Sequence, residues 1–237
     1  MRGILIRVGV DQAFGGWNAP VDPRSREFAY VPIPEGPQRR GLETRYSAIE
    51  PALSRFPGMS LPASLVTRAT HLDPDFAYLT YGDNGVRRGR GLADFKKDDF
   101  LVFFAGLRPA GPWADPLIYA VIGFYRVQQC IRLSDIPRER WCENAHTRRT
   151  EHRSTDIIIR AEPGVSGRLR RCIVIGEWRD RAYRVRGDIL DAWGGISYSN
   201  GYIQRSAVPP TLLHPERFLS WFQGHKPELL AVNNPSE

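Results

Sequence analysis

The sequence contains few cysteines and no paired cysteine motif. The number of cysteines is odd, and no two of them form a CxxC pair: they are Cys130, Cys142 and Cys172. A disulfide framework and a structural zinc site are therefore both disfavoured. Free cysteines in this number fit a reducing compartment best, so we expect a cytoplasmic protein.

Long apolar runs are absent as well. No stretch approaches the roughly 18 consecutive apolar residues of a membrane span. Arg7 and Asp11 interrupt the apolar residues near the N-terminus, which predicts an opening strand and not a signal peptide. We therefore expect a soluble protein with no membrane partner.

Several common catalytic motifs are missing. The chain has no GxxxxGK[ST] loop, no GxGxxG between a strand and a helix, no GxSxG and no HExxH. Their absence removes the commonest classes of NTPase, dehydrogenase, hydrolase and zinc protease from consideration.

Positive charge, by contrast, is plentiful and unevenly distributed. The net charge is +7, and residues 81–190 alone hold 19 Arg and 2 Lys against 14 acidic residues, which also gives +7. Such a focused basic region is expected for a partner that carries phosphate, either a nucleic acid or a nucleotide. An arginine-rich composition can also come from a GC-rich genome, so a purely solubilising charge stays open.

The hydrophobic pattern predicts one α+β domain over residues 1–237, with a mostly antiparallel, barrel-like sheet and a few short helices. Two long apolar runs rich in aromatic residues predict a buried antiparallel hairpin. The expected strands are 3–10, 27–34, 100–107, 117–127, 156–160 and 172–178. The expected short helices are 48–55, 134–142, 188–193 and 215–223, and the tail 226–237 is expected to fray.

The turn after the first strand is the first candidate site. Gly15 and Gly16 allow the backbone to turn tightly and to approach a ligand closely. Trp17 can stack on a base, while Asp11 and Asn18 can form hydrogen bonds with its edges. The alternative is a plain turn with a packed tryptophan.

A second candidate combines an imidazole with several carboxylates. His71, Asp73 and Asp75 are followed by a Thr-Tyr-Gly-Asp segment that ends at Asp83. These groups can serve as acid–base catalysts or as metal ligands. Their spacing matches no metal motif that we can justify, so His71 and Asp83 are catalytic candidates and no metal site is predicted. A rigid loop followed by a turn is the structural alternative.

A third candidate is the polar run from Asn144 to Arg153. Guanidinium groups of Arg148, Arg149 and Arg153 can hold phosphate by charge and forked hydrogen bonds, and His146 can also transfer a proton. The run lacks strong periodicity and predicts an exposed loop. A solvated basic loop is the alternative.

Residues 92–127 resemble part of the PUA, ASCH and EVE-like barrels. In those domains a K-x-G-D-x-hydrophobic segment enters a strand, and here Lys96 to Asp99 lead into FLVFFAGL. Asp98 stands where those families have glycine. The resemblance implies a barrel that binds RNA or modified bases in a cleft, as an analogy of fold.

A broader resemblance runs nearly from end to end. The chain resembles the third family of nucleotide-modification-associated domains in an ordered series of segments: Arg7–Asp11, Gly15–Gly16, Phe28–Glu35, His71–Pro74, Thr80–Asp83, Leu101–Leu107, Ile122–Gly123 and Asn144–His146. That family occurs beside genes for DNA base modification. The resemblance therefore implies a nucleic-acid context, DNA more than RNA, without specifying a cofactor.

Three functions follow as hypotheses. The first is a module that recognises a modified base, in which Trp17 stacks, Asn18 and Asn144 contribute to binding, and the three arginines hold phosphates. The second is a transferase or hydrolase acting on a nucleobase or nucleotide, with His146 as general acid/base and Asp11 or Asp83 as its partner carboxylate. The third is an interaction protein whose charge only keeps it soluble.

Overall fold

A long antiparallel hairpin forms the centre of the structure. The computed structural model describes residues 1–37, 40–86, 91–111, 116–204 and 208–235. The hairpin joins β6 (Phe100–Pro109) to β7 (Ile118–Arg132), as the two apolar runs predicted, and the tip of its turn lies outside the described residues. Every residue from Phe100 to Leu107 is buried, because this strand is covered on both faces.

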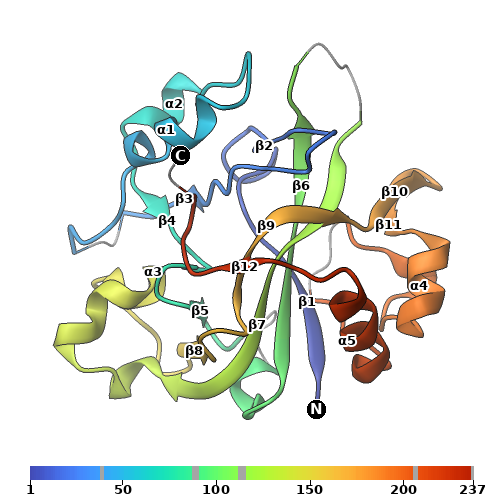
Figure 1. Cartoon of the computed structure of the whole chain (residues 1–237). Coiled ribbons are helices and arrows are strands. Elements are labelled where there is room, and N and C mark those ends of the chain that lie inside the picture. The colour runs from blue at the N-terminus through green and yellow to red at the C-terminus, as the bar shows by residue number, and fades with distance from the viewer. Residues whose placement is uncertain (38–39, 87–90, 112–115, 205–207, 236–237) are drawn as a thin grey trace.

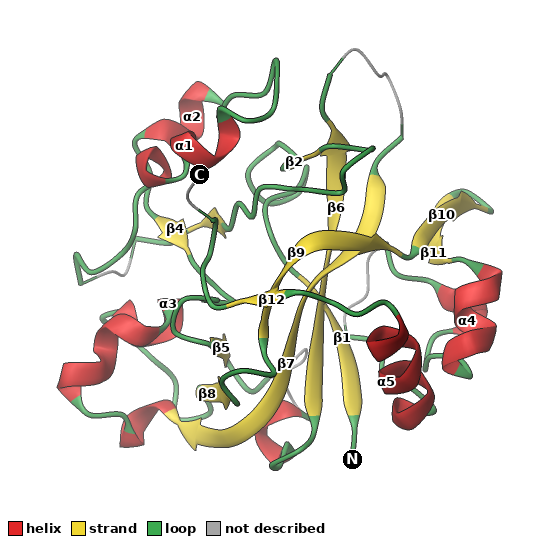
Figure 2. Cartoon of the chain, viewed as in Figure 1, coloured by secondary structure: helices red, strands yellow, loops and turns green. Residues whose placement is uncertain are grey.

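Other strands extend the hairpin into a mixed sheet (Figures 1 and 2). The main path runs β1-β6-β7-β8-β5, with β2 also on β6 and β9 between β7 and β12. The pairs are antiparallel except that β1 and β2 run parallel to β6. The bounds of these strands are β1 (Gly3–Arg7), β2 (Pro20–Val21), β5 (Thr80–Asp83), β8 (Ile157–Ala161), β9 (Gly167–Val174) and β12 (Leu229–Leu230).

The sheet does not close into the PUA-like barrel that we expected. Its outer strands β1 and β5 do not pair with each other. The outer edge of β1 is instead covered by residues 210–212, which exchange backbone hydrogen bonds with Gly3 and Leu5. Two further sheets are small and separate: β3 (Ile33–Pro34) with β4 (Thr70–His71), and β10 (Gly176–Arg179) with β11 (Ala182–Val185). The α+β class is confirmed, and the barrel is not.

The expected strand over residues 27–34 is mostly absent. Phe28 to Val31 are buried, yet only β3 at the end of this segment forms a ladder. Pro32 and Pro34 have no backbone N–H to donate, so a regular ladder cannot continue through them. The first strand likewise ends at Arg7, earlier than predicted.

Short helices lie around the periphery of the sheet (Figure 2). The predictions near the C-terminal half agree with α4 (Gly187–Trp193) and α5 (Pro215–Gly224), while the segment 134–142 forms the 3-10 turns η3 (Leu133–Asp135) and η4 (Arg138–Glu143). The remaining helical elements are η1 (Tyr46–Ala48), α1 (Glu50–Leu53), α2 (Ala63–Val66), η2 (Leu92–Asp94), α3 (Ala145–Arg148) and η5 (Ser199–Gly201). Within the described ranges, every helix is too short or too polar to cross a membrane.

The tail beyond Lys226 is docked and not frayed over its described part. Strand β12 pairs with β9, and the Asn234 side chain exchanges hydrogen bonds with the backbone of Tyr30. Asn233 similarly accepts from the amide of Phe76. Figure 1 shows this last segment crossing the sheet toward α1 and α2. These polar contacts and the pairing of β12 with β9 together hold the described part of the tail on the sheet.

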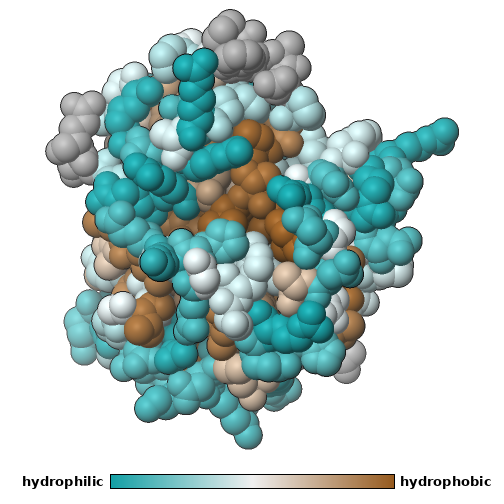
Figure 3. Space-filling model, turned by 45° about the vertical axis from the view of Figure 1, so that its right-hand side comes forward, coloured by the Kyte–Doolittle hydropathy of each residue, from teal (hydrophilic) through white to brown (hydrophobic). Residues whose placement is uncertain are grey.

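Aromatic side chains dominate the core beneath this crossing. Phe76 is fully buried and meets the rings of Tyr30, Phe103 and Tyr125 edge-on, at centroid distances of 5.1 to 5.8 Å. Such geometry adds to the stabilisation that comes from burial alone. The surface in Figure 3 is largely polar. Apolar side chains gather in a recess on this face, which is seen after the side of Figure 1 that carries α4 and α5 is turned forward.

Replacing Phe76 should therefore destabilise the protein strongly. We expect Phe76→Ala to lower the free energy of unfolding by about 3–5 kcal/mol, since it leaves a cavity among three aromatic rings. Phe14→Ala is the matched control, because Phe14 is 50% exposed in a surface turn. Urea denaturation measures both. A Phe76→Ala midpoint equal to that of the control would contradict this packing role.

Candidate functional site

The loop between β4 and β5 is anchored to the core by hydrogen bonds to its backbone. Two buried tyrosines donate hydrogen bonds to its backbone: the Tyr30 hydroxyl to the carbonyl of Pro74 (3.0 Å) and the Tyr125 hydroxyl to that of Asp75 (2.9 Å). Phe76 packs into the core directly afterwards. The core thus fixes the positions of the polar side chains that this loop presents.

A buried ion pair joins this loop to helix α3. The Arg148 guanidinium lies 2.7 Å from the Asp75 carboxylate, and the two side chains are only 4% and 1% exposed. Asp75 also accepts a hydrogen bond from Asn233 (2.9 Å), and Arg148 donates to the carbonyl of Cys142 (3.0 Å). These bonds offset much of the cost of burying the two charges, although Arg148 Nη1 has no hydrogen-bond partner among the described residues.

Asn144 positions the two sides of the site. Its side-chain oxygen accepts from the amide of His146 and caps α3, in a capping box completed by Thr147. Its amide nitrogen donates to Asp73 Oδ1 at 2.9 Å. Gly82 permits this approach: a Cβ there would lie 2.5 Å from both Asn144 and the His146 ring. The backbone amide of Gly82 gives Asp73 Oδ1 a second hydrogen bond (2.8 Å).

Two imidazoles and a carboxylate converge at this point. One potential ligand atom from each of His71, Asp73 and His146 lies within 4.8 Å of the other two. The imidazole centroids are 5.1 Å apart, and His146 Nε2 is 3.7 Å from Asp73 Oδ2. All three side chains are more than nine-tenths buried. We refer to these three residues as the His–Asp–His cluster.

Glu35 supports one member of the cluster from behind. Its carboxylate lies 2.8 Å from His71 Nδ1 and accepts a weaker pair of contacts from Arg149 at 3.3 to 3.4 Å. A carboxylate only accepts, so His71 Nδ1 carries the proton and donates. The Nε2 lone pair of His71 is therefore left free.

Burial governs the protonation of these groups. Burial lowers the pKa of His71, against the opposing effect of Glu35, and it lowers the pKa of His146 well below its usual value. Burial also raises the pKa of Asp73 well above the usual value, even though Asn144 and Gly82 oppose this by hydrogen bonding. Burial alone would raise the pKa of Glu35, but His71 and Arg149 outweigh it and the pKa is lowered. Both imidazoles are thus neutral near pH 7.

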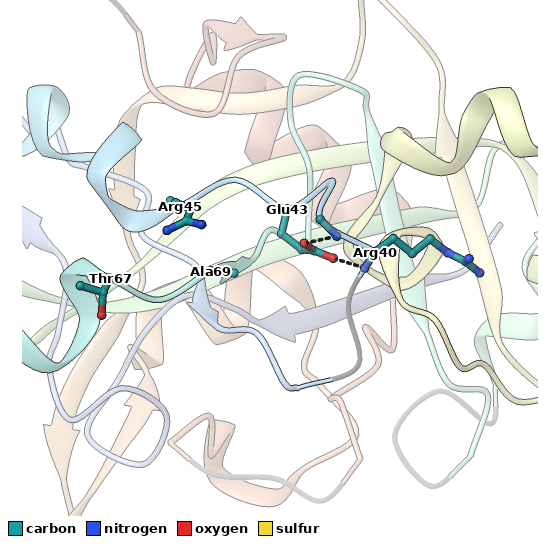
Figure 4. Close-up of a pocket in the computed structure, with 6 residues that line it drawn as sticks. Arg40, Glu43, Arg45, Thr67 and Ala69 are labelled. Carbon is teal, nitrogen blue, oxygen red and sulfur yellow. Dashed lines mark hydrogen bonds between the residues drawn. The ribbon is translucent and has the colours of Figure 1, made fainter.

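A basic-lined cavity of about 410 Å³ lies beside the start of β4 (Figure 4), and its lining residues in the described part of the chain do not include members of the His–Asp–His cluster. Its lining includes Ala69, two residues before His71, and Arg40, whose amide donates to the carbonyl of Arg148. The Glu43 carboxylate is occupied by the amides of Arg40 and Gly41, at 2.8 and 3.0 Å. Arg45 lies on the opposite side of Glu43 from Arg40 (Figure 4).

Comparison with family models identifies the chain. Residues 2–201 match the model for nucleotide modification associated domain 3. The chain belongs to this family. The matched span includes Glu35 and the whole His–Asp–His cluster, whereas Asn233 lies beyond it. No curated protein and no solved structure matches the chain.

The polar run of this nucleotide modification associated domain is not the exposed loop that we expected. Residues 144–148 are buried, and the run begins with the capped helix α3. Arg148 forms the internal ion pair with Asp75, and Arg149 is partly exposed beside Glu35. Arg153 is exposed, as expected. The signal that we overlooked is the Asn-x-x-Thr pattern at 144–147, which is a helix start.

The other predicted residues are placed differently. Asp11 pairs with Arg7 at 2.7 Å and accepts from the turn amides of Ala13 and Phe14. Asn18 is buried and donates to the carbonyl of Gly106 (2.8 Å), while Trp17 is half-buried against the core. These contacts are those of a structured turn, the alternative given above.

Asp83 is half-buried at the end of β5. Burial is the main cause of the raised pKa of Asp73, and the negative charge of Asp83 raises this pKa further. Sequence reasoning placed Asp73 in the second candidate site beside His71 but chose only His71 and Asp83 there as catalytic residues, and it did not consider Glu35 as a site residue. The available signal for Asp73 was its position two residues after His71, since alternate residues of an extended segment share a face. Glu35 gave no local signal, because 36 residues separate it from His71.

Removing Arg148 should destabilise this domain strongly and not merely weaken ligand binding. We expect Arg148→Ala to cost about 3–5 kcal/mol of stability, because it leaves the Asp75 charge buried without its partner. Arg153→Ala is the control and should stay within about 0.5 kcal/mol of wild type. Thermal and urea unfolding measure both variants. Wild-type stability of Arg148→Ala would show that the ion pair is dispensable.

Proposed function

We propose that the protein is an enzyme of nucleotide modification that acts on a nucleobase or nucleotide, free or within DNA, at the His–Asp–His cluster. The observation that carries this proposal is the convergence of His71, Asp73 and His146 from distant segments in a family associated with nucleotide modification. Buried groups of this kind are costly to assemble without a role, and perturbed pKa values gather at active sites.

The residues around the cluster support an enzyme more than a module that only binds a base. Glu35 and Asn144 fix the orientations of His71 and Asp73 through hydrogen bonds of 2.8 and 2.9 Å. Such fixed geometry is what a catalytic centre needs, since small displacements of reacting groups reduce rates strongly. The turn after β1 is a weaker candidate for base recognition. Its polar side chains already bind the protein, since Asn18 donates to the carbonyl of Gly106 and Asp11 pairs with Arg7.

The cavity beside the start of β4 supports a nucleotide as substrate. Its volume of about 410 Å³ is within the usual range of roughly 300–1,000 Å³ for small-molecule sites. Arg45 is exposed at its edge, and a guanidinium there suits a phosphate oxygen. The net charge of +7 adds a general attraction for DNA.

Turnover should depend on the cluster. We expect the purified protein, given deoxynucleotides or short DNA and a protein-free cell extract as a source of co-substrates, to change the mass of a nucleoside. His146→Gln should reduce this change more than 100-fold, within the range of roughly 10²–10⁴ attributed to one acid–base group. His152→Ala should have wild-type activity, because His152 is an exposed imidazole of the same segment. Mass spectrometry of the nucleosides measures the change.

The outcome against this proposal is specific. Tight binding of nucleotides or DNA with no change of mass in any nucleoside would favour the recognition module over the enzyme. Equal activity of His146→Gln and wild type, with the fold of both verified by circular dichroism, would move the chemistry away from the cluster.

Binding of DNA should fall steeply as salt increases. Each phosphate contact releases counterions, so affinity falls with a slope of about 0.9 per contact in a log–log plot. Arg45→Ala should weaken binding and flatten the slope, whereas Arg132→Ala, an exposed arginine at the end of β7, serves as its control. Fluorescence anisotropy with labelled duplex and single-stranded DNA at several salt concentrations measures the slope. Absence of binding to either at low salt would contradict the prediction for DNA.

A further inference from the structure

The donor atoms of the His–Asp–His cluster face one another. His71 and Asp73 are two residues apart on an extended segment, and His146 enters from α3. Their potential ligand atoms lie within 4.8 Å of one another. Bonds of about 2.0–2.2 Å to one metal ion place neighbouring ligand atoms about 3.0–3.5 Å apart. Side-chain movements of about 1 Å would therefore bring the three atoms to coordinating distance.

One ring nitrogen of His146 has no hydrogen-bond partner among the described residues. Its Nδ1 is buried with no partner in the described part of the chain. Its Nε2 is 3.7 Å from Asp73 Oδ2, beyond the length of a hydrogen bond. Buried polar atoms are nearly always satisfied, so an imidazole buried in this way requires an explanation. An ion between His146, Asp73 and His71 would coordinate the Nε2 lone pair, with the proton of the neutral ring kept on Nδ1.

The neighbours of the cluster leave the coordinating atoms free. Glu35 accepts from His71 Nδ1, so only Nε2 of that ring is available. Asn144 and Gly82 both donate to Asp73 Oδ1 and leave Oδ2 toward His146. A carboxylate behind a histidine is the usual outer partner of a metal ligand, because it fixes the orientation and tautomer of the ring.

We infer that His71, Asp73 and His146 bind one divalent first-row transition-metal ion. Two imidazoles with one carboxylate suit iron, manganese, cobalt or zinc, whereas magnesium and calcium prefer oxygen ligands only. Three protein ligands leave further coordination positions for water or substrate, as catalytic metal sites do. The inference deepens the proposed function, since the ion is assigned to the same centre. Glu35 and Asn144 are positioning residues of this site.

Metal titration of the full, untagged chain tests the inference. After treatment with a chelator, the protein should bind one Co²⁺ per chain, with a visible d–d absorption band, and Zn²⁺ should displace it. Asp73→Asn and His146→Gln should each lose more than about 100-fold in Co²⁺ affinity, and Glu35→Gln about 10–100-fold. His152→Ala and Glu139→Gln, both exposed, should bind like wild type. Mg²⁺ should not compete.

Two results would overturn the metal site. One is the absence of stoichiometric Co²⁺ or Zn²⁺ binding by the folded wild-type chain. The other is wild-type Co²⁺ affinity in Asp73→Asn and His146→Gln, with circular dichroism showing both to be folded. Loss of affinity in the folded conservative variant Asp73→Asn supports the site even where His146→Gln fails to fold.

The Co²⁺ titration tests the metal site independently of the proposed function, because it measures metal binding and not enzyme activity. Binding of one Co²⁺ by a protein that changes no nucleoside supports the metal site and counts against the enzyme. Nucleoside modification that continues undiminished in the chelated, metal-free protein supports the enzyme and overturns the metal as its cofactor.

Discussion

The buried ion pair between Asp75 and Arg148 connects the two segments that carry the candidate site. Asp75 belongs to the loop that presents Asp73, and Arg148 ends the helix that presents His146. Arg148 and Asp75 are only 4% and 1% exposed. Removal of either side chain would leave the charge of the other buried without its partner. Removing one partner of such a pair is costly, so the geometry of the cluster depends on keeping both.

Polar and apolar anchors cooperate around this pair. Phe76 secures the loop in the aromatic core, while the hydroxyls of Tyr30 and Tyr125 bind its carbonyl groups. Asn233 then ties the C-terminal segment to Asp75. A network in which nearly every member is satisfied becomes rigid in a low-dielectric interior. Rigidity of this kind is useful where imidazole and carboxylate groups must be held close together without collapsing onto one another.

Membership in nucleotide modification associated domain 3 gives the cluster its context. The His–Asp–His cluster, its supporting carboxylate Glu35 and the cavity beside β4 all come from segments within residues 2–201, where the family model matches. The long hairpin β6–β7 supplies the surface on which these segments are assembled. The cluster is therefore carried by a loop and a short helix on a sheet-based scaffold.

The sequence alone predicted helix α4, helix α5 from a proline at its start, and the β6–β7 hairpin from two long apolar runs, because these signals are local. It also pointed to His71, Asn144 and His146. The three-dimensional contacts were needed to show that Asp73 and Glu35 join His71 and His146, that Arg148 is buried, and that the sheet stays open. Those outcomes depend on contacts between residues tens of positions apart, which hydrophobic periodicity and local spacing do not encode.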